Sequence, residues 1–194
     1  MTYSECVPRR SGQKGEHRRA EILAAARRLL VDEGYDRFVL RDIAARVGVM
    51  LGNLQYYYAT RDDLLEALIR AEFAANQAEI AAIATGPGDA DTRLAAITRH
   101  LIAVWARDGG RVYAVMSFLA LHHDRFRALH REIYAAFYES LLPILRELRP
   151  RTSRAELLET ARLVTTVIDG ALVQLPSRAF VARAVAAVGA LARG

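Results

Sequence analysis

Cysteine is almost absent from this 194-residue chain, because Cys6 is the only one. A disulfide within one chain is therefore excluded, as is a metal site built from several cysteines. No apolar run reaches the roughly 20 residues that span a bilayer, and the most apolar stretch covers only 184–192. Residues 1–14 are polar and basic without an apolar segment behind them, which predicts no signal peptide. We expect a soluble, cytoplasmic protein.

Motifs of catalysis are missing too. The sequence has no glycine-rich phosphate loop, no paired histidines at metal-binding spacing and no nucleophile elbow. His122 and His123 are adjacent, and neighbouring residues on a helix point about 100° apart, which is a poor arrangement for one ion. We expect no enzyme, no cofactor and no metal site. A helical enzyme remains an alternative, which turnover of a bound small molecule would support.

Lysine is nearly absent, since Lys14 is the only one among 27 basic residues. The 22 acidic residues leave a net charge of +5. This excess permits a polyanionic partner but does not require one. Five basic residues lie near the N-terminus, where they either contact DNA or have no binding role: Arg9, Arg10, Lys14, Arg18 and Arg19.

Apolar residues recur at helical spacing almost throughout, without the alternation that is typical of strands. The pattern predicts an all-α protein of about nine helices. Gly34 and Gly48 are expected to end helices, Thr60 to cap one, and Ser153 with Glu156 to form a capping box. The expected helices cover about 16–33, 40–47, 51–57, 61–85, 91–107, 111–121, 125–148, 154–175 and 178–192.

The clearest break in the chain is the turn-forming stretch 86–89, which reads Gly-Pro-Gly-Asp. We place a domain boundary there. The expected organisation is a disordered basic tail over 1–15, an N-terminal domain with a connecting helix over 16–85, and a helical body over 89–194.

The most informative segment is 37–65, where Gly48 joins two short predicted helices. The side chains expected to be buried together with the first helix of the chain are Ile43, Ala44, Val47, Leu54 and Tyr58. The second helix then directs small and hydrogen-bonding side chains outward. A short helix of this kind suits a reader of the DNA major groove.

This segment resembles the TetR family of transcriptional repressors over about residues 17–70. The fold implied is an N-terminal three-helix helix-turn-helix domain followed by a helical dimerisation and effector-binding body. In the body, the resemblance is limited to the number and length of helices and to Asp169-Gly170. The matching motifs are Asp32-Glu33-Gly34-Tyr35, Asp42-Ile43-Ala44, Gly48-Val49, Gly52-Asn53-Leu54-Gln55-Tyr56-Tyr57-Tyr58 and Thr60-Arg61-Asp62-Asp63-Leu64-Leu65.

The resemblance implies roles for individual residues. Arg41 would reach a base edge or a phosphate, and Tyr57 and Arg61 would hold phosphates. The residues that would face bases are Leu51, Gly52, Asn53, Gln55 and Tyr56. The alternatives are that these tyrosines are core or surface residues and that Arg61 is a solvated helix-start residue.

Three positions depart from the family pattern. Gln55 stands where tyrosine is usual, Met50 replaces a hydroxyl residue, and Leu40 replaces a common threonine. Glutamine can pair with adenine through two hydrogen bonds, so Gln55 would change the preferred sequence without removing DNA binding. Leu40 removes one expected phosphate contact.

The last two predicted helices carry apolar stripes at three- and four-residue spacing. The stripes either pack on each other within one chain or, as the resemblance implies, form a four-helix interface with a second subunit. We favour the homodimer, because a single helix-turn-helix reads too few bases. The predicted interface consists of Leu157, Ala161, Val164, Ile168, Ala171, Leu175, Val181, Val185 and Val188, with Ala184 and Leu191 on the same stripes.

Aromatic and sulfur-containing side chains are frequent in the middle helices. The resemblance implies that these helices enclose a pocket for a small effector, whereas such residues are in general ordinary core. The predicted effector residues are Trp105, Tyr113, Met116, Phe118, His122, Tyr134, Phe137 and Tyr138.

The sequence therefore predicts a DNA-binding regulator, in particular a repressor that a small-molecule effector releases from a palindromic operator. Its expected partners are double-stranded DNA, a second copy of the chain and the effector, with no membrane. A transcriptional activator and a helical adaptor without DNA affinity are the alternatives.

Overall fold

The structure is a computed structural model that describes residues 10–174 and 177–194. Within these ranges all regular structure is helical, so the all-α prediction is confirmed. The chain divides into two compact units, one ending at Leu68 and the other beginning at Ile69. We call them the N-terminal unit and the C-terminal unit.

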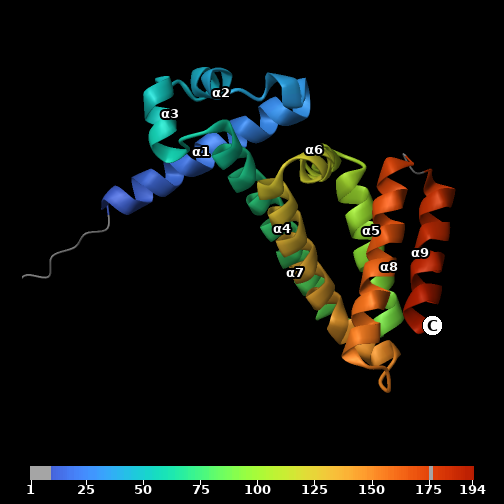
Figure 1. The fold of residues 1–194 in the computed structure, drawn as a ribbon. Coiled ribbons are helices and arrows are strands. Elements are labelled where there is room, and N and C mark those ends of the chain that lie inside the picture. The colour runs from blue at the N-terminus through green and yellow to red at the C-terminus, as the bar shows by residue number, and fades with distance from the viewer. Residues whose placement is uncertain (1–9, 175–176) are drawn as a thin grey trace, which may run out of the picture. The chain divides into compact units, whose positions relative to one another are not determined.

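The N-terminal unit contains α1 (Arg10–Glu33), the 3-10 turn η1 (Tyr35–Arg37), α2 (Leu40–Val47), α3 (Leu51–Tyr57) and the start of α4 (Arg61–Ala84) (Figure 1). The bounds of α2 and α3 agree with the predicted helices. Their apolar sides close over α1 in a core that includes Ile22, Leu29, Phe38, Ile43 and Leu54.

Helix α1 begins at Arg10, so the prediction of a disordered tail is wrong for residues 10–15. Glycine weakens a helix without ending it. Further along α1, the pair of Arg18 with Glu21 supports the helix. The remainder of the predicted tail, residues 1–9 with Arg9, lies outside the described residues.

Glycines and side-chain caps end and begin the helices as expected. Gly48 ends α2 in the left-handed conformation, with φ 71° and ψ 36°. Gly34 follows α1 with φ 84° and ψ 177°, a positive-φ extended conformation rather than the left-handed helical one. At the start of α4, the Asp63 amide donates to Thr60 Oγ1 over 3.1 Å and the Thr60 amide donates to Asp63 Oδ2 over 3.0 Å.

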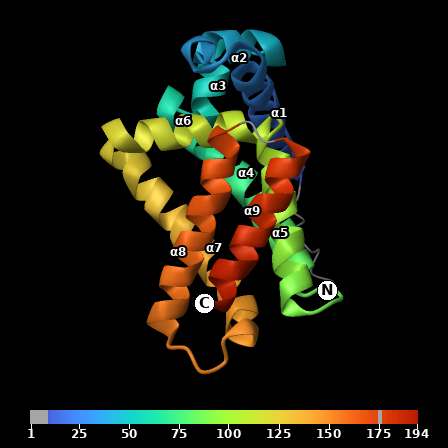
Figure 2. The same ribbon diagram turned by 90° about the vertical axis from the view of Figure 1, so that its right-hand side faces the viewer.

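The C-terminal unit contains the rest of α4 and five further helices, in which α8 packs against both α7 and α9, and α5 also packs against α9 (Figures 1 and 2). The predicted capping box is present, because Ser153 and Glu156 exchange hydrogen bonds at the start of α8. In the described residues, no helix is both apolar and long enough to cross a bilayer. The five helices are α5 (Ala90–Trp105), α6 (Gly109–His122), α7 (Asp124–Leu148), α8 (Arg154–Val173) and α9 (Arg178–Arg193).

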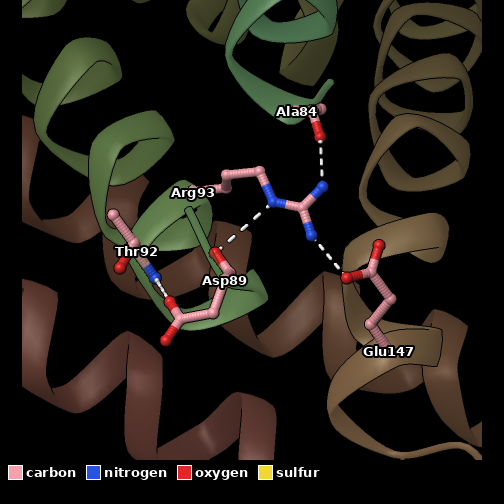
Figure 3. Close-up of polar contacts among 5 residues, drawn as sticks. All are labelled: Ala84, Asp89, Thr92, Arg93 and Glu147. Carbon is pink, nitrogen blue, oxygen red and sulfur yellow. Dashed lines mark hydrogen bonds and ion pairs between the residues drawn. The ribbon is translucent and has the colours of Figure 1, made fainter. Parts of the chain in front are cut away.

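The turn between α4 and α5 lies inside the C-terminal unit, and the two units divide within α4 rather than at the turn. Its stability comes from Arg93, which joins three segments (Figure 3). The Arg93 guanidinium donates to the Ala84 carbonyl over 2.8 Å, pairs with Glu147 of α7, and donates to the Asp89 carbonyl. Asp89 caps α5 by accepting from the Thr92 amide over 2.8 Å.

The apolar stripes of α8 and α9 face the core of their own unit. The members of the stripes without exposed surface pack within one chain, which was the alternative, and they offer nothing to a second chain. Val181, Val185 and Leu191 keep exposed surface, so their place at a dimer interface, like the dimer itself, stays a prediction. The buried residues of the prediction are Leu157, Ala161, Val164, Ile168, Ala171, Ala184 and Val188, those partly buried are Val181, Val185 and Leu191, and Leu175 lies outside the described residues.

Candidate functional site

The helix-turn-helix geometry follows from the way α2 and α3 are anchored. Ile43 and Leu54 are fully buried and Ala44 nearly so, while Tyr58 after α3 is also in the core. The left-handed Gly48 between the helices lets the chain turn sharply after α2. One side of α3 is therefore fixed to the core, and the other is directed to solvent.

The outward side of α3 carries the side chains that the sequence assigned to bases. Gly52, Asn53, Gln55 and Tyr56 are exposed, and Tyr56 keeps 81% of its surface accessible. Its ring meets the Tyr57 ring edge-on at 5.2 Å, so two tyrosines lie together beside this surface.

Other predicted contact residues frame this surface. Arg41 is exposed on α2, whereas Leu51 and Tyr57 are half-buried. A Cβ atom added at Gly52 would meet nothing within 4 Å. Nothing in the described part of the chain therefore requires glycine at position 52, whereas the close approach of a partner would.

Basic residues of α1 lie beside α3. Lys14, His17 and Arg18 line an open hollow together with Asn53 and Tyr57. The sequence analysis missed His17. Its signal was the spacing of 14, 17 and 18, which places these residues on one face of a helix once α1 is known to include them.

Arg19 supports the end of α3 from the same helix. Its guanidinium lies 5.5 Å from the centre of the Tyr57 ring and 5.7 Å from that of Tyr58, and it donates to the Tyr57 carbonyl. The contact fixes Tyr57 beside the exposed surface.

Arg61 has a different environment from the one predicted. Its guanidinium lies 4.0 Å from the centre of the Tyr35 ring and donates to the Tyr35 carbonyl over 2.5 Å. This arrangement fastens η1 to the start of α4. The guanidinium contacts Tyr35 of the same chain. It is therefore not the fully solvated group of the alternative, and it is engaged differently from the predicted phosphate contact.

A small cavity lies inside the C-terminal unit. Its volume is about 20 Å³, room for about one water molecule. Three predicted effector residues, Trp105, Tyr134 and Phe137, line it. The full lining is Phe73, Asn76, Gln77 and Ile80 of α4, Leu101 and Trp105 of α5, Ile133, Tyr134 and Phe137 of α7, and Thr165 of α8.

A buried polar cluster joins three helices next to this cavity. The Tyr134 hydroxyl lies 2.9 Å from the Tyr113 hydroxyl and 2.9 Å from Asp169 Oδ2. Each hydroxyl carries one hydrogen, so the Tyr134 hydroxyl donates to only one of these two partners at a time. Burial raises the pKa of Asp169 to about 6, against the opposing effect of hydrogen bonds from the two tyrosines. Burial and the nearby Asp169 also raise the pKa of Tyr113 and of Tyr134, which keeps both phenols neutral.

The remaining predicted effector residues divide into two groups. Tyr113 stacks on Trp105 and Tyr138 contacts Tyr134 edge-on, so both adjoin the lining, and Met116 is fully buried without being part of it. Phe118 and His122 pack against each other on the exposed side of α6, so their assignment to the cavity is wrong.

Sequence reasoning missed the polar residues of this region, notably Gln77 and Asp169. The signal for Asp169 was a carboxylate one residue after Ile168, at the edge of an otherwise apolar stripe. The described residues contain no group of three or more histidine, cysteine or acidic side chains arranged for a metal ion.

Comparisons with known proteins agree with this geometry. Residues 22–68 match the family model of bacterial regulatory proteins, tetR family. A comparison with curated protein sequences gives no match.

Solved structures with a similar fold cover nearly the whole chain. A TetR transcription regulator from Haloarcula marismortui ATCC 43049 has a TM-score of 0.77 at 22% identity, over 91% of this chain and 97% of that one. A TetR-family regulator from Streptomyces coelicolor has a TM-score of 0.74 at 19% identity, over 92% and 95%. A transcriptional regulator from Saccharomonospora viridis, in complex with choline, has a TM-score of 0.73 at 20% identity, over 90% and 95%.

Proposed function

We propose that this chain is a DNA-binding regulator of the TetR family, and that it is a repressor that a small molecule releases from a palindromic operator. The match of residues 22–68 to the family model supports the DNA-binding part of the proposal. The observation that carries this proposal is the outward side of α3. Asn53, Gln55 and Tyr56 are directed to solvent from a short helix whose other side is fixed in the core. Side chains held in this way can enter a major groove and bond to base edges.

Around α3, the proposed phosphate contacts come from both flanking helices. Arg41 of α2 and Lys14, His17 and Arg18 of α1 supply the basic groups, with Tyr57 beside them. Arg61 is left out of this set because its guanidinium is held on Tyr35. Phosphate contacts position the domain on DNA, and base contacts select the sequence.

We assign homodimerisation to the exposed sides of α8 and α9 instead of their buried stripes. Leu163 of α8 and Phe180 of α9 are large apolar residues with 55% and 40% of their surface exposed. On the same two helices, Gly170 and the alanines at 182, 186 and 190 are exposed and small enough for close helix approach. A two-fold dimer would place two copies of α3 on the two halves of a palindrome.

The effector would act through α4. This helix lines the cavity with Phe73, Gln77 and Ile80, and it runs without a break from Arg61 in the N-terminal unit. A molecule larger than the present cavity has to move the lining apart, and movement of α4 would alter how the two DNA-binding units of a dimer are spaced. The effector shifts the equilibrium between the DNA-binding and the released conformation only by the difference in its affinity for the two. The choline complex of the Saccharomonospora viridis regulator supports a small-molecule site in this fold.

The decisive test is selection of DNA sites from a random duplex library, followed by binding measurements at two salt concentrations. We expect a palindromic site, two chains per site and affinity that falls steeply with salt. Gln55→Ala and Arg41→Ala should weaken binding at least tenfold. Arg151→Ala, which removes an exposed arginine from the C-terminal unit, serves as the control. Failure to enrich any sequence, with no salt-dependent binding, would favour the helical adaptor.

A reporter placed behind the selected site decides the direction of regulation. Repression predicts that expression rises when the gene for this chain is deleted, whereas activation predicts that expression falls.

A further inference from the structure

Among the described residues, two hydrogen-bond acceptors at or beside the cavity of the C-terminal unit have no donor. Asp169 Oδ2 accepts from Tyr134, but Asp169 Oδ1 is buried and has no partner. Gln77 Oε1, in the lining of the cavity, is also buried without a partner. An unmatched buried acceptor is costly, and native proteins keep few of them. A ligand that brings positive charge or donors would remove this cost.

Aromatic faces surround the same region. Trp105 stacks on Tyr113 with ring centres 4.9 Å apart, and His130 stacks on Tyr134 at 4.2 Å. Tyr138 meets Tyr134 edge-on at 5.9 Å. Trp105 and Tyr134 belong both to this aromatic group and to the cavity lining. Aromatic faces attract cations through their negative π-surface, and organic ammonium groups are bound in this way.

Among the described residues, no cationic side chain is paired with Asp169. Burial lowers the pKa of His130, so its imidazole stays neutral near pH 7. Arg162 lies 5.9 Å from the Tyr138 ring centre but pairs with Glu159 at 2.5 Å. The carboxylate of Asp169 is therefore matched only by tyrosine hydroxyls.

We propose that Trp105, Tyr134 and Asp169 form the recognition site for an organic cation, a ligand with a substituted ammonium group. Asp169 Oδ1 would face the positive charge, the aromatic rings would surround its alkyl substituents, and Gln77 would accept from any donor it carries. The proposal rests on the proposed function, because it takes this site to be the effector site and names the chemistry of that effector.

Other ligand classes fit less well. An anion would meet the Asp169 carboxylate, with its unmatched Oδ1, and the unmatched Gln77 Oε1. A metal ion requires several ligating groups, and the described residues supply no such cluster. A neutral hydrocarbon would fill the aromatic space but leave Asp169 Oδ1 without a partner.

The cavity of about 20 Å³ is too small for a substituted ammonium ion, so binding requires the lining side chains to move. Trp105 would report this movement directly. It is the only tryptophan in the chain, and it stacks on Tyr113 at the edge of the site.

Trp105 fluorescence, read on the full-length protein without DNA, is the test. The two probes are choline and 3,3-dimethyl-1-butanol. They have the same shape, but choline has a positively charged quaternary nitrogen where the alcohol has a neutral quaternary carbon. We expect choline to bind at least tenfold more tightly than the alcohol. Equal affinity for both probes would overturn the cationic assignment. Failure to bind either probe, as expected of a cavity that holds only water, would also overturn it.

Two variants locate the charge that is recognised. Asp169→Asn should reduce choline affinity about tenfold or more while the affinity for the alcohol changes less than twofold. Asp124→Asn removes an exposed carboxylate from the same unit and should change neither. If Asp169→Asn does not fold, the comparison of the two probes on the unchanged protein still decides the proposal. Since DNA is absent from this measurement, loss of DNA binding and loss of cation binding are separate results.

Discussion

At the scale of single residues, Asp169 combines its proposed role in binding with a penalty in stability. Burial raises its pKa from 3.8 to about 6 in the folded chain. A carboxyl whose folded pKa is raised destabilises the fold fully above pH 6, where it is charged in both states. The penalty disappears as pH falls through 6 towards 4, because the folded chain then binds a proton that the unfolded chain does not. Retention of such a group is typical of binding sites.

Asp169→Asn should therefore stabilise the protein at pH 8, by up to about 3 kcal/mol. The asparagine carbonyl can still accept from Tyr134, so the hydrogen bond of the cluster is kept. Near pH 4 the advantage should shrink towards zero, because the native carboxyl is then neutral as well. Urea unfolding of both proteins at the two pH values measures the difference. If Asp169→Asn raises the free energy of unfolding equally at pH 8 and at pH 4, burial of the charge is not the cause of the gain.

Gly52 tests how closely α3 approaches DNA. Gly52→Ala adds a methyl group into space that is empty within 4 Å, so the fold should accept it. Within a helix, alanine is favoured over glycine by about 0.5–1 kcal/mol, and the melting temperature should not fall. We expect a loss of at least tenfold in affinity for the selected DNA site. If the affinity falls only together with the melting temperature, the argument for close approach is removed.

At the scale of helices, Arg93 connects the turn after α4 to both α5 and α7. Arg93→Met keeps most of the side-chain volume but removes the bonds to the Ala84 carbonyl and to Glu147. We expect a loss of about 1–3 kcal/mol in the free energy of unfolding, because the carbonyl then loses a partly buried partner. Arg99→Met, an exposed arginine on the same helix, should cost less than about 0.5 kcal/mol. Chemical denaturation of the two variants gives the comparison.

Helices were predictable because their signals are local. Thr60, Ser153 and Gly48 act on backbone groups within a few residues, and all three perform the predicted role. The division into units was placed at the turn 86–89 because a turn and a domain boundary look alike in sequence. Only the contacts of Arg93 across the fold reveal that this turn belongs inside the C-terminal unit.

The candidate sites differ in how far sequence could define them. The exposed side of α3 follows from one short helix, so Gln55 and Tyr56 could be named in advance. The role of Arg61 could not, because its contact with Tyr35 joins residues 26 positions apart. Asp169, Tyr134 and Tyr113 come from three helices, and no local pattern predicts that their polar atoms meet.

At the scale of the whole molecule, dimerisation depends on which side of α8 and α9 remains open. An apolar stripe in sequence indicates burial but not the identity of the chain that buries it. Here the stripe packs inside its own unit, and Leu163 on the opposite side of α8 is 55% exposed. The proposed interface therefore consists of apolar and small side chains that are exposed on the otherwise polar sides of α8 and α9.

Leu163→Glu should convert the dimer into monomers, because two copies would bring like charges together in an apolar contact. The fold should tolerate the change, since the side chain is exposed. DNA binding should become at least tenfold weaker, because single chains lose the second half-site. Leu121→Glu is the matched control: Leu121 is 74% exposed on α6, away from the proposed interface. Light scattering after size-exclusion chromatography gives the mass of each variant. If both variants remain dimeric and bind DNA normally, the interface involves neither leucine; if both dissociate, charge on the C-terminal unit rather than the α8 surface controls assembly.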